Sequence, residues 1–491
     1  MTLRRYERYK DGGVEWLGAV PAHWDVAAVG YRYEVLLGKM LDEKRITGKH
    51  LAPYLRNIDV QWDRINIEDL PQMDFSGDDL NRYSVFPGDL LVCEGGEVGR
   101  AAIWRGELSE CYYQKAIHRL RRRREAADHP RFMFYVLRMA AAIGVFEASE
   151  GKSTIAHLTA ESLRRYRFAF PPRREQECIS SFLDREAAKI DTLIAEQQRL
   201  IELLTEKRHA VIARAVTKGL NPAAPMKDSG VEWLGEVPGH WRVVPVKYLA
   251  EVGNGSTPHR DRADYWTDGD YPWLSSTVVN GEVVLEAEEF VTELALTECH
   301  LPKVTPPAVL IGITGQGKTR GMAALLGIEA TTNQHIAFVR PRDNCTSAEF
   351  LRRYFETAYQ RMRFESDGVG STKGAITCEQ ISNMRLPIPP PEEQNAIVVH
   401  LSHVTSELDR LALEATTAIE LLRERRTALI SAAVTGQIDV RDSASVESAL
   451  AETRADIAAG RYVVESAATH VARVQAMAAA DEHSPSPPHS C

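Results

Sequence analysis

The sequence predicts a mixed α/β (α+β) protein: two globular domains separated by two long antiparallel helices that form a coiled-coil spacer, with a pseudo-two-fold internal repeat. Three observations predict this architecture. The chain has 491 residues, which is too many for a single hydrophobic core. Its two halves repeat one another, and each half ends in a long segment with a helical pattern of apolar residues.

The internal repeat relates three separate stretches of sequence. Residues 11–24 read DGGVEWLGAVPAHW and residues 228–241 read DSGVEWLGEVPGHW, an offset of about 217 residues. Nearly the same offset relates PPRREQ at 171–176 to PPPEEQ at 389–394, and AVT at 215–217 to AVT at 433–435. A repeat of about 20–50 residues would predict a solenoid, whereas a repeat of this length predicts two domains with their own cores.

The segments that follow the two proline-rich stretches are predicted to be helices. Neither Gly nor Pro occurs between Glu175 and Val216 or between Glu393 and Val434. Apolar residues recur there at spacings of three, four and seven, which is typical of an amphipathic helix with one apolar seam. Glu186 and Gln197 interrupt the seam of the first copy. A stripe of this length must be buried, so we expect the helices to pair with each other; separate packing of each helix on its own domain is the alternative.

Glycines and the remaining patterns set the expected boundaries. Gly219 and Gly436 are expected to end the two helices. Short β-like runs at 89–93, 283–285, 308–311 and 337–339 alternate with helical patterns at 131–142 and 347–359. We therefore expect a first domain at 1–170, a spacer helix at 171–218, a second domain at 228–388, a second spacer helix at 389–437, and a tail at 441–491 that is helix-prone and then disordered.

Composition argues against several classes of protein. No apolar run approaches the ~18 residues that a membrane span needs, and the charged N-terminus lacks the apolar core of a signal peptide. Seven cysteines without a C-x-x-C pair give neither a zinc-ligand set nor a disulfide framework, which favours the reducing cytoplasm. The net charge is -9, and this argues weakly against a chain that binds nucleic acid unaided.

The three repeated stretches carry a family resemblance. V-E-W-L-G-x-V-P-x-H-W at the start of each half, P-P-x-x-E-Q before each helix and A-V-T-x-G at its end resemble the specificity (S) subunits of Type I restriction–modification systems. The resemblance runs from Gly13 to about Ile438 and occurs in both copies. The tail after Arg441 lies outside it.

This resemblance implies a DNA-recognition subunit that is not itself an enzyme. Each domain would be a target-recognition domain that reads one half of an asymmetric, bipartite site in double-stranded DNA. The paired helices would set the unread spacer and dock the modification subunits, of which two are expected, while restriction subunits complete the complex. S-adenosylmethionine, ATP and Mg²⁺ would be used by those partner subunits, so no catalytic residue, metal site or bound cofactor is expected in this chain.

Two functions of other classes compete with this interpretation. Residues 312–319 read GITGQGKT, a literal match to the phosphate-binding loop of nucleotide hydrolases. No later apolar strand ends in an aspartate for the metal, and LLVCEGGEVG at 90–99, the corresponding stretch of the first domain, has neither the lysine nor the Ser/Thr. A glycine-rich hairpin shared by both domains accounts for both copies. The other competitor is a coiled-coil scaffold without affinity for DNA.

Candidate DNA contacts are basic and hydroxyl residues in predicted loops of each domain. Arginine and lysine neutralise phosphates and reach guanine edges, and shorter polar side chains bond to the backbone or to bases. GKST at 151–154 and GSTK at 370–373 occupy matching places ahead of the proline-rich stretches. The candidates are Lys39, Arg45, Lys49, Arg56, Lys115, Arg119, Arg121, Lys152, Ser153 and Thr154 in the first domain, and Thr257, Arg260, Arg262, Lys318, Arg320, His335, Ser371, Thr372 and Lys373 in the second.

Overall fold

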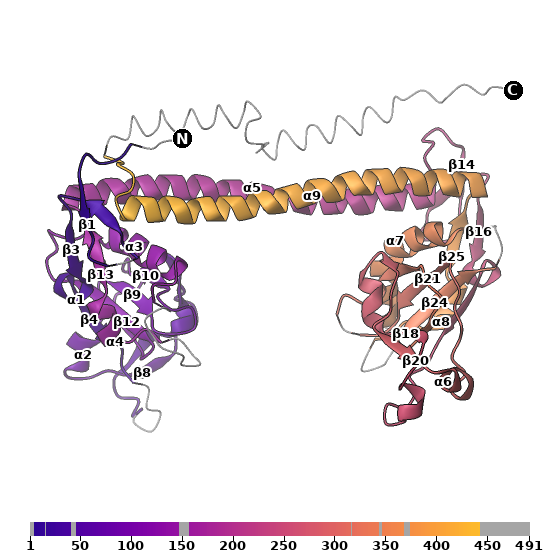
Figure 1. The fold of residues 1–491 in the computed structure, drawn as a ribbon, viewed down its shortest axis with the longest axis horizontal. Helices are drawn as coiled ribbons and strands as arrows, with labels where there is room; N and C mark the ends of the chain where they lie inside the picture. Colours follow the sequence, from indigo (N-terminus) through magenta and orange to yellow (C-terminus); the bar gives the residue numbers. More distant parts are fainter. Residues whose placement is uncertain are drawn as a thin grey trace. The chain divides into compact units, whose positions relative to one another are not determined.

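The computed structural model describes residues 4–14, 16–40, 46–146, 157–315, 317–342, 346–367 and 374–441. The chain divides into two compact units (Figure 1). Unit 1 combines Met1–Arg199 with Ala415–Cys491, and unit 2 is Leu200–Glu414. Because the divisions fall inside the two long helices, each unit contains a globular domain and a part of both helices.

Two β-sheets of more than two strands lie in the domain of unit 1. The larger has the order β10-β9-β12-β4, with every pair antiparallel, and the smaller has the order β11-β5-β8. Their strands are β4 (Tyr33–Leu37), β5 (Leu51–Leu55), β8 (Gln72–Asp74), β9 (Leu90–Cys93), β10 (Ala101–Ile103), β11 (Tyr112–Tyr113) and β12 (Ile117–Arg122). Helix α3 (Pro130–Ala142) covers the face of β9 that carries Leu90 and Val92, while Leu91 and Cys93 belong to a second core.

Unit 2 repeats this arrangement with one additional strand. Its larger sheet has the order β17-β24-β21-β22-β19, and its smaller sheet has the order β20-β18-β23. The strands are β17 (Ala250–Asn254), β18 (Tyr271–Leu274), β19 (Val283–Val284), β20 (Glu289–Val291), β21 (Ala308–Gly312), β22 (Ala323–Leu326), β23 (Thr331–Thr332) and β24 (Ile336–Pro341). Helix α7 (Ala348–Asp367) packs on β21 and β22. The structural repeat thus follows the sequence repeat.

Short elements complete both units. In unit 1 they are β1 (Tyr9–Asp11), β2 (Ala19–Pro21), β3 (Asp25–Ala28), α1 (Val29–Arg32), η2 (Asn57–Asp59), β6 (Val60–Gln61), β7 (Arg64–Ile65), α2 (Asp79–Arg82), α4 (Ala160–Arg165) and β13 (Arg167–Phe170). In unit 2 they are β14 (Met226–Asp228), β15 (Glu236–Pro238), β16 (Arg242–Pro245), η3 (Val246–Tyr248), η4 (Ala263–Tyr265), η5 (Ser276–Asn280), α6 (Glu293–Glu298), α8 (Cys378–Asn383) and β25 (Arg385–Ile388).

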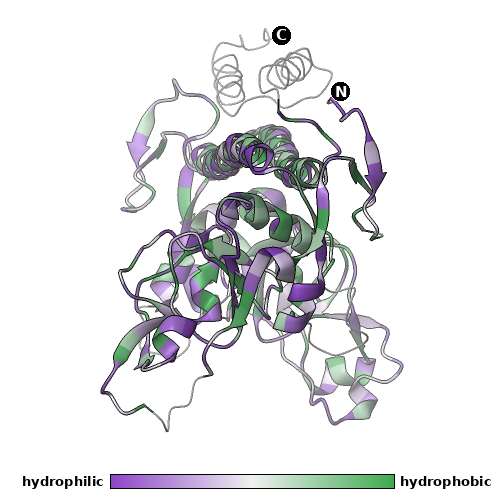
Figure 2. Cartoon of the chain, turned by 90° about the vertical axis from the view of Figure 1, so that its left-hand side faces the viewer, coloured by the Kyte–Doolittle hydropathy of each residue, from purple (hydrophilic) through white to green (hydrophobic). Residues whose placement is uncertain are grey.

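The two long helices are α5 (Arg173–Lys218) and α9 (Pro391–Val434), and they lie side by side (Figure 1). Both carry hydrophilic and hydrophobic residues around their circumference (Figure 2). Gly219 and Gly436, with φ of 73° and 75°, follow their last turns, as expected from the freedom of glycine in the left-handed region.

The predicted pairing of the helices is confirmed in each unit. In unit 1 the first turns of α5 share a core with the last turns of α9, and in unit 2 the last turns of α5 share a core with the first turns of α9, so the helices run antiparallel. Ion pairs join them across the seam: Asp191 to Arg426 at 2.5 Å in unit 1, and Asp409 to Arg208 at 3.1 Å in unit 2. Glu186 and Gln197, which interrupt the apolar pattern, are both buried.

The repeated sequence stretches bind to one another in space. In unit 1 the Glu175 carboxylate accepts hydrogen bonds from Tyr6 Oη (2.6 Å) and Trp24 Nε1 (3.0 Å) and lies 2.8 Å from His23 Nε2. In unit 2 the Glu393 carboxylate accepts a hydrogen bond from Trp241 Nε1 (3.0 Å) and lies 2.7 Å from His240 Nε2. The histidine–tryptophan pair that opens each half is therefore anchored to the glutamate that opens each helix.

The glutamine beside each glutamate caps a domain helix. Gln176 Oε1 accepts from the backbone N–H of His129 (2.8 Å), the residue before α3, and Gln394 Oε1 accepts from that of Ser347 (3.0 Å), before α7. These N–H groups have no partner inside their own helices. The Glu-Gln pair thus fixes each domain to a long helix through two elements at once.

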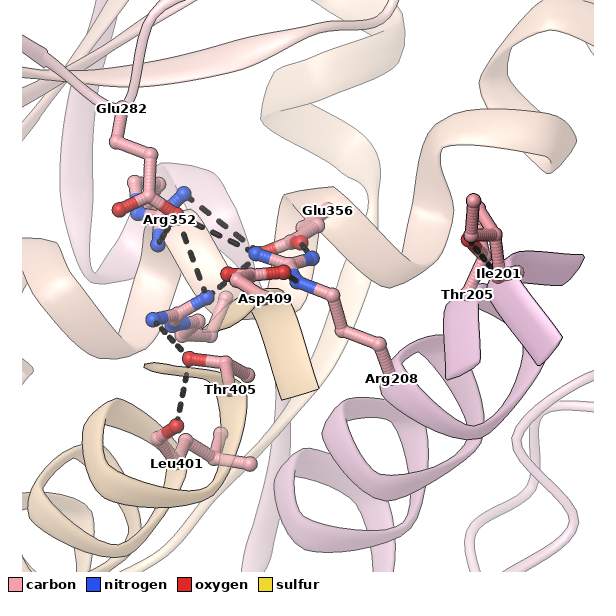
Figure 3. Close-up of polar contacts among 10 residues, drawn as sticks. Ile201, Thr205, Arg208, Glu282, Arg352, Glu356, Leu401, Thr405 and Asp409 are labelled. Atoms are coloured by element: carbon pink, nitrogen blue, oxygen red, sulfur yellow. Dashed lines mark hydrogen bonds and ion pairs between the residues drawn. The ribbon is translucent and has the colours of Figure 1, made fainter. Parts of the chain in front are cut away.

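A second anchor in unit 2 is a cluster of arginines and carboxylates between α7 and the two long helices (Figure 3). Arg208 of α5 pairs with Glu356 of α7 and with Asp409 of α9. Arg352 and Arg353 of α7 are almost entirely buried, and both pair with Glu356, at 3.6 and 3.1 Å. Buried guanidinium groups need such partners because desolvation of an unpaired charge costs several kcal/mol.

The same cluster extends to the β-sheet and to α9. Glu282, in the turn that precedes β19, pairs with Arg352 (3.4 Å) and with Arg208 (3.3 Å). Arg353 donates to Thr405 of α9 at 3.3 Å, and Thr405 in turn donates to the carbonyl of Leu401 at 2.8 Å. Charged groups from the sheet, from α7 and from both long helices therefore meet within one unit (Figure 3).

Candidate nucleic-acid interface

In each domain the loops converge at one place, which we call the sheet corner. It comprises the residues that follow the edge strand β4 or β17 of the larger sheet and the residues that precede the adjacent strand, β12 or β24. In unit 1, β4 is followed by Gly38, whose N–H donates to the Ile117 carbonyl at 3.0 Å. The backbone carbonyl of Lys39 accepts a hydrogen bond from the backbone N–H of Lys115 at 2.7 Å. A Cβ at Gly38 would collide with the backbone of Gln114. Only glycine permits this close approach, which brings the predicted Lys39 and Lys115 onto adjacent chain segments.

The sheet corner of unit 2 has the same construction. Gly255 follows β17 as Gly38 follows β4, and a Cβ there would collide with the carbonyl of Thr332. Two residues later lies the predicted Thr257, and on the neighbouring segment lie Gln334, which is exposed, and the predicted His335. The side chains of the unit 2 corner therefore differ from those of unit 1: Gln334 stands at the position of Lys115, and Ser256, beside Thr257, at that of Lys39.

A chain of hydrogen bonds connects the polar side chains of the unit 2 corner. Thr257 Oγ1 donates to Gln334 Oε1 at 2.6 Å, and Gln334 Nε2 lies 3.2 Å from His335 Nε2. The other ring nitrogen, Nδ1, lies 2.8 Å from Thr314 Oγ1 in the next hairpin. Three segments that are distant in the sequence thus contribute to one polar array.

The unit 1 corner is built around a lysine and a carboxylate. Lys39 Nζ lies 2.7 Å from Asp79 Oδ2, donates to the carbonyl of Asp74 at 2.5 Å, and lies 4.8 Å from the centre of the Phe75 ring. Part of its charge is therefore already neutralised by the protein. Lys115 is exposed, and so is Lys49 in the loop that precedes β5.

The loop that carries Lys49 is held by Asp74. The carboxylate of Asp74 accepts from the backbone N–H groups of Thr47, Gly48 (3.0 Å) and His50 (2.8 Å), and from Thr47 Oγ1 at 3.0 Å. These bonds, with that from His50 the strongest, lower the pKa of Asp74 to about 2. The carboxylate is therefore ionised, and the loop held, at any physiological pH.

Glycine-rich hairpins flank both corners, as the sequence predicts. Residues between β9 and β10, and between β21 and β22, connect antiparallel neighbours. The chain returns to each hairpin at a matching place: the N–H of Leu158 donates to the Glu94 carbonyl at 2.8 Å, and that of Ile376 to the Ile313 carbonyl at 2.8 Å. The GKST and GSTK stretches immediately precede these returning segments in the sequence.

The hairpin argues against the nucleotide-hydrolase alternative. A phosphate-binding loop leads from a strand into the N-terminus of a helix, whose N–H groups bind the phosphates. The loop at 312–319 leads instead into β22, which pairs antiparallel with β21, and the described residues between Thr319 and β22 form no helix. Lys318 is exposed at the tip of this hairpin, where it remains a candidate contact to DNA phosphate.

Two of the predicted arginines lie in the interior. Arg119, 1% exposed, donates to the carbonyls of Arg82 (3.1 Å) and Ser84 (2.7 Å) and pairs with Glu34. Arg320, 4% exposed, pairs with Asp367 at 2.6 Å. Their guanidinium groups stabilise the domains, and we leave both residues out of the proposed DNA surface.

Four other predicted arginines are each bound to a neighbouring carboxylate. In unit 1, Arg56 pairs with Asp59 at 2.8 Å and Arg121 with Asp89 at 2.6 Å. Those of unit 2 are half exposed, and their planes lie over aromatic rings. Arg260 pairs with Glu289 at 2.5 Å, and its guanidinium carbon lies 3.9 Å from the centre of the Trp266 ring. Arg262 pairs with Asp264 at 2.6 Å, and its guanidinium carbon lies 4.3 Å from the centre of the Tyr265 ring. The remaining candidates, Arg45, Lys152, Ser153, Thr154, Ser371, Thr372 and Lys373, lie outside the described residues.

Gln334 and Thr314 belong to the unit 2 corner but are not among the candidates predicted from the sequence. A signal was present, since Gln334 adjoins His335 in the stretch that aligns with the Lys115 stretch of the first domain. The hydrogen bond from Thr257 could not be foreseen, because its partner lies 77 residues away. Across the described ranges, no three His, Cys, Asp or Glu side chains are grouped so as to hold a metal ion, and no helix there is long and apolar enough to cross a membrane.

Comparison with known proteins identifies the family. The family model described as "Type I restriction modification DNA specificity domain" matches residues 40–203 and 238–421, one match in each half of the chain. The specificity subunit of the type I restriction enzyme MjaX of Methanocaldococcus jannaschii is 22% identical over 434 residues, which cover 87% of this chain and 96% of that protein. The matches therefore extend over both repeats.

Two solved structures share the fold. A chain from a structure of the assembly and conformational transition of the type I R-M system aligns with a TM-score of 0.66 at 16% identity, over 84% of this chain and 98% of that one. The HsdS subunit of Thermoanaerobacter tengcongensis aligns with a TM-score of 0.53 at 17% identity, over 87% and 100%. Given the two domains on a shared frame, the paired helices and a family match over more than half of its length, the chain belongs to the DNA specificity subunits of Type I restriction–modification systems and is a recognition subunit, not an enzyme.

Proposed function

We propose that this chain reads an asymmetric, bipartite site in double-stranded DNA, with the sheet corner of each domain reading one half-site. The observation that carries the proposal is the contrast between the two corners. The frame is repeated, down to the glycine that lets two segments meet, but Lys39 and Lys115 occupy one corner while Thr257, Gln334 and His335 occupy the other. Two domains with the same fold but different side chains at the sheet corner suit two different half-sites, whereas identical side chains at both corners would suit a palindrome.

In this proposal the paired helices set the unread spacer and dock two modification subunits, and restriction subunits join that complex. Methyl transfer from S-adenosylmethionine and ATP-driven cleavage with Mg²⁺ take place in those partners. The family and the paired helices support this division of labour. The net charge of -9 supports it too, because a chain with this charge needs basic surface from partners to hold DNA.

The test is to map methylated positions in the genome of a host that carries the intact operon. We expect methylation at a two-part motif with a fixed unread gap. Exchange of the second domain for that of another specificity subunit should change one half of the motif and leave the other half unchanged. Methylation at a single continuous motif, or a change in both halves after the exchange, would contradict the proposal.

A further inference from the structure

The polar array of the unit 2 corner holds one exposed amide in a defined orientation. The backbone around Gln334 is fixed, because the N–H of Asn333 donates to the Leu274 carbonyl at 3.0 Å and Asn333 Oδ1 accepts from the N–H of His335 at 2.9 Å. Asn333 itself is buried. Gln334 therefore projects from a rigid turn between β23 and β24 while its own side chain remains exposed.

The hydrogen bonds of the side chain determine which way the amide faces. The hydroxyl of Thr257 donates to Oε1, and the amide nitrogen of Gln334 donates to His335 Nε2. His335 then carries its proton on Nδ1 and donates to Thr314 Oγ1. Free glutamine side chains lose up to about 2 kcal/mol of rotamer entropy when they become ordered, and here much of that ordering precedes any binding.

The amide retains one donor and one acceptor. A glutamine amide has two N–H donors and an oxygen with two lone pairs. Within the described residues Gln334 uses one N–H and one lone pair, so one of each remains. In the major groove, adenine presents N6–H as a donor and N7 as an acceptor, whereas guanine presents two acceptors, cytosine one donor, and thymine one acceptor beside a methyl group. Adenine is the base that matches the remaining pair.

The equivalent position of the other domain supports a role in reading. Lys115 occupies that position on the segment that enters β12, and an ammonium group has only donors. Lysine can bond to phosphate or to the O6 and N7 acceptors of guanine, but it has no acceptor for the N6–H of adenine. The same place in the two domains thus carries groups of different specificity.

We propose that Gln334 reads an adenine in the half-site of the second domain and that Thr257 and His335 hold its amide for that contact. This inference rests on the proposed function. Gln334 is the residue that touches the base, and Thr257 is a positioning residue.

The experiment maps methylated positions genome-wide in hosts that carry the operon with Gln334→Ala or Thr257→Val. Gln334→Ala should relax the requirement for adenine at one position of one half-site, by roughly 5- to 150-fold. Thr257→Val removes the hydroxyl and keeps the shape of the side chain. It should relax the same position by a smaller factor, with every other position and the spacer unchanged.

The matched control is Gln360→Ala, which removes an exposed glutamine from α7 of the same unit and should leave the motif unchanged. Wild-type preference at every position in Gln334→Ala would overturn the inference. So would relaxation of a position that is not adenine, or loss of all methylation in Gln334→Ala together with an unchanged motif in Thr257→Val. A wild-type motif without two parts would instead refute the proposed function, so the two failures are distinguishable.

Discussion

Arg119 and Lys115 lie four residues apart and look equivalent in the sequence, yet their environments are opposite. Arg119 is buried in β12, the strand between β9 and β4, where its guanidinium satisfies two carbonyl groups. Lys115 is exposed at the sheet corner, before the strand begins. The sequence could not separate them, because the boundary of β12 and the carbonyls that bind Arg119 are set by segments more than 30 residues away.

At this scale we predict that Arg119→Met destabilises unit 1. The substitution leaves the carbonyls of Arg82 and Ser84 without their buried donor, which should lower the free energy of unfolding by roughly 2 kcal/mol or more. Denaturant unfolding measures this change, and Lys115→Met should shift it by less than about 0.5 kcal/mol. A change for Arg119→Met as small as that expected for Lys115→Met would show that the guanidinium has no structural role.

Lys115 should matter instead for DNA. If it contacts phosphate, Lys115→Ala should weaken binding by the complex with its modification subunits and reduce the slope of log K against log salt by about 1. Titration of labelled duplex at several salt concentrations measures that slope. Lys10→Ala, which removes an exposed lysine from β1, is the control and should leave the slope unchanged. An unchanged slope in both variants would exclude a phosphate contact by Lys115.

At the scale of elements, patterns of short range were predicted well. The long helices, their glycine ends, the strands β9, β21 and β24 and the glycine-rich hairpins all follow from local periodicity and turn chemistry. Helix α7 was expected at 347–359 but extends to Asp367. Its last turns contact the hairpin, since Tyr359 Oη donates to the Lys318 carbonyl at 2.9 Å and Arg363 Nη1 to the Gly317 carbonyl at 2.6 Å. Such tertiary support is not visible in helix propensity.

The arginine–carboxylate cluster predicts how unit 2 responds to acid. Burial acts to raise the pKa of Glu356, but the charge and hydrogen bond of Arg208 outweigh it, and the pKa lies below the ordinary 4.5. A carboxyl whose pKa is lower in the folded state stabilises the fold fully above its unfolded pKa, and this contribution is lost as the pH falls through the folded pKa. Unit 2 should therefore lose stability as the pH falls below about 4.5.

The variant that tests this is Glu356→Gln. At neutral pH it should lower the free energy of unfolding by about 3 kcal/mol, because three arginines lose their shared carboxylate. Between about pH 5 and pH 3 its thermal midpoint should fall less steeply than that of the wild type, since the titrating group is absent. Thermal unfolding followed by circular dichroism provides both readings. Parallel pH profiles would mean that other carboxyls control the acid response.

At the scale of the whole molecule, the repeat allowed the sequence to predict the fold class, but it could not define the recognition surface. The repeat locates the residues that join each domain to a long helix, because those residues are the same in both copies. The corners are where the copies differ, so repetition gives no guide to them. Thr257, Gln334 and Thr314 come together only because β17, β24 and β21 are neighbours in one sheet.

The proposed spacer role makes a prediction about length. Insertion of seven residues near Gln197 of α5, with seven more near Glu414 of α9, keeps the apolar seam in register. It adds about 10 Å of helix, so the unread gap should grow by roughly three base pairs while both half-sites stay the same. Methylome mapping measures the gap. Seven residues inserted at 221–225, in the turn after α5, should leave the gap unchanged, and an unchanged gap in the helix variant would count against the spacer role.

The division of the chain into units has a consequence for biosynthesis. Ile430, Ala433, Val434, Ile438 and Val440 complete the core of unit 1, although most of that unit is translated first. Unit 2, which is continuous from Leu200 to Glu414, is translated in full before the last of those residues is added. The domain that is translated first is thus the last to have all the residues of its core, and until then its buried Trp24 lacks the neighbours around Gly436 that are encoded near the far end of the message.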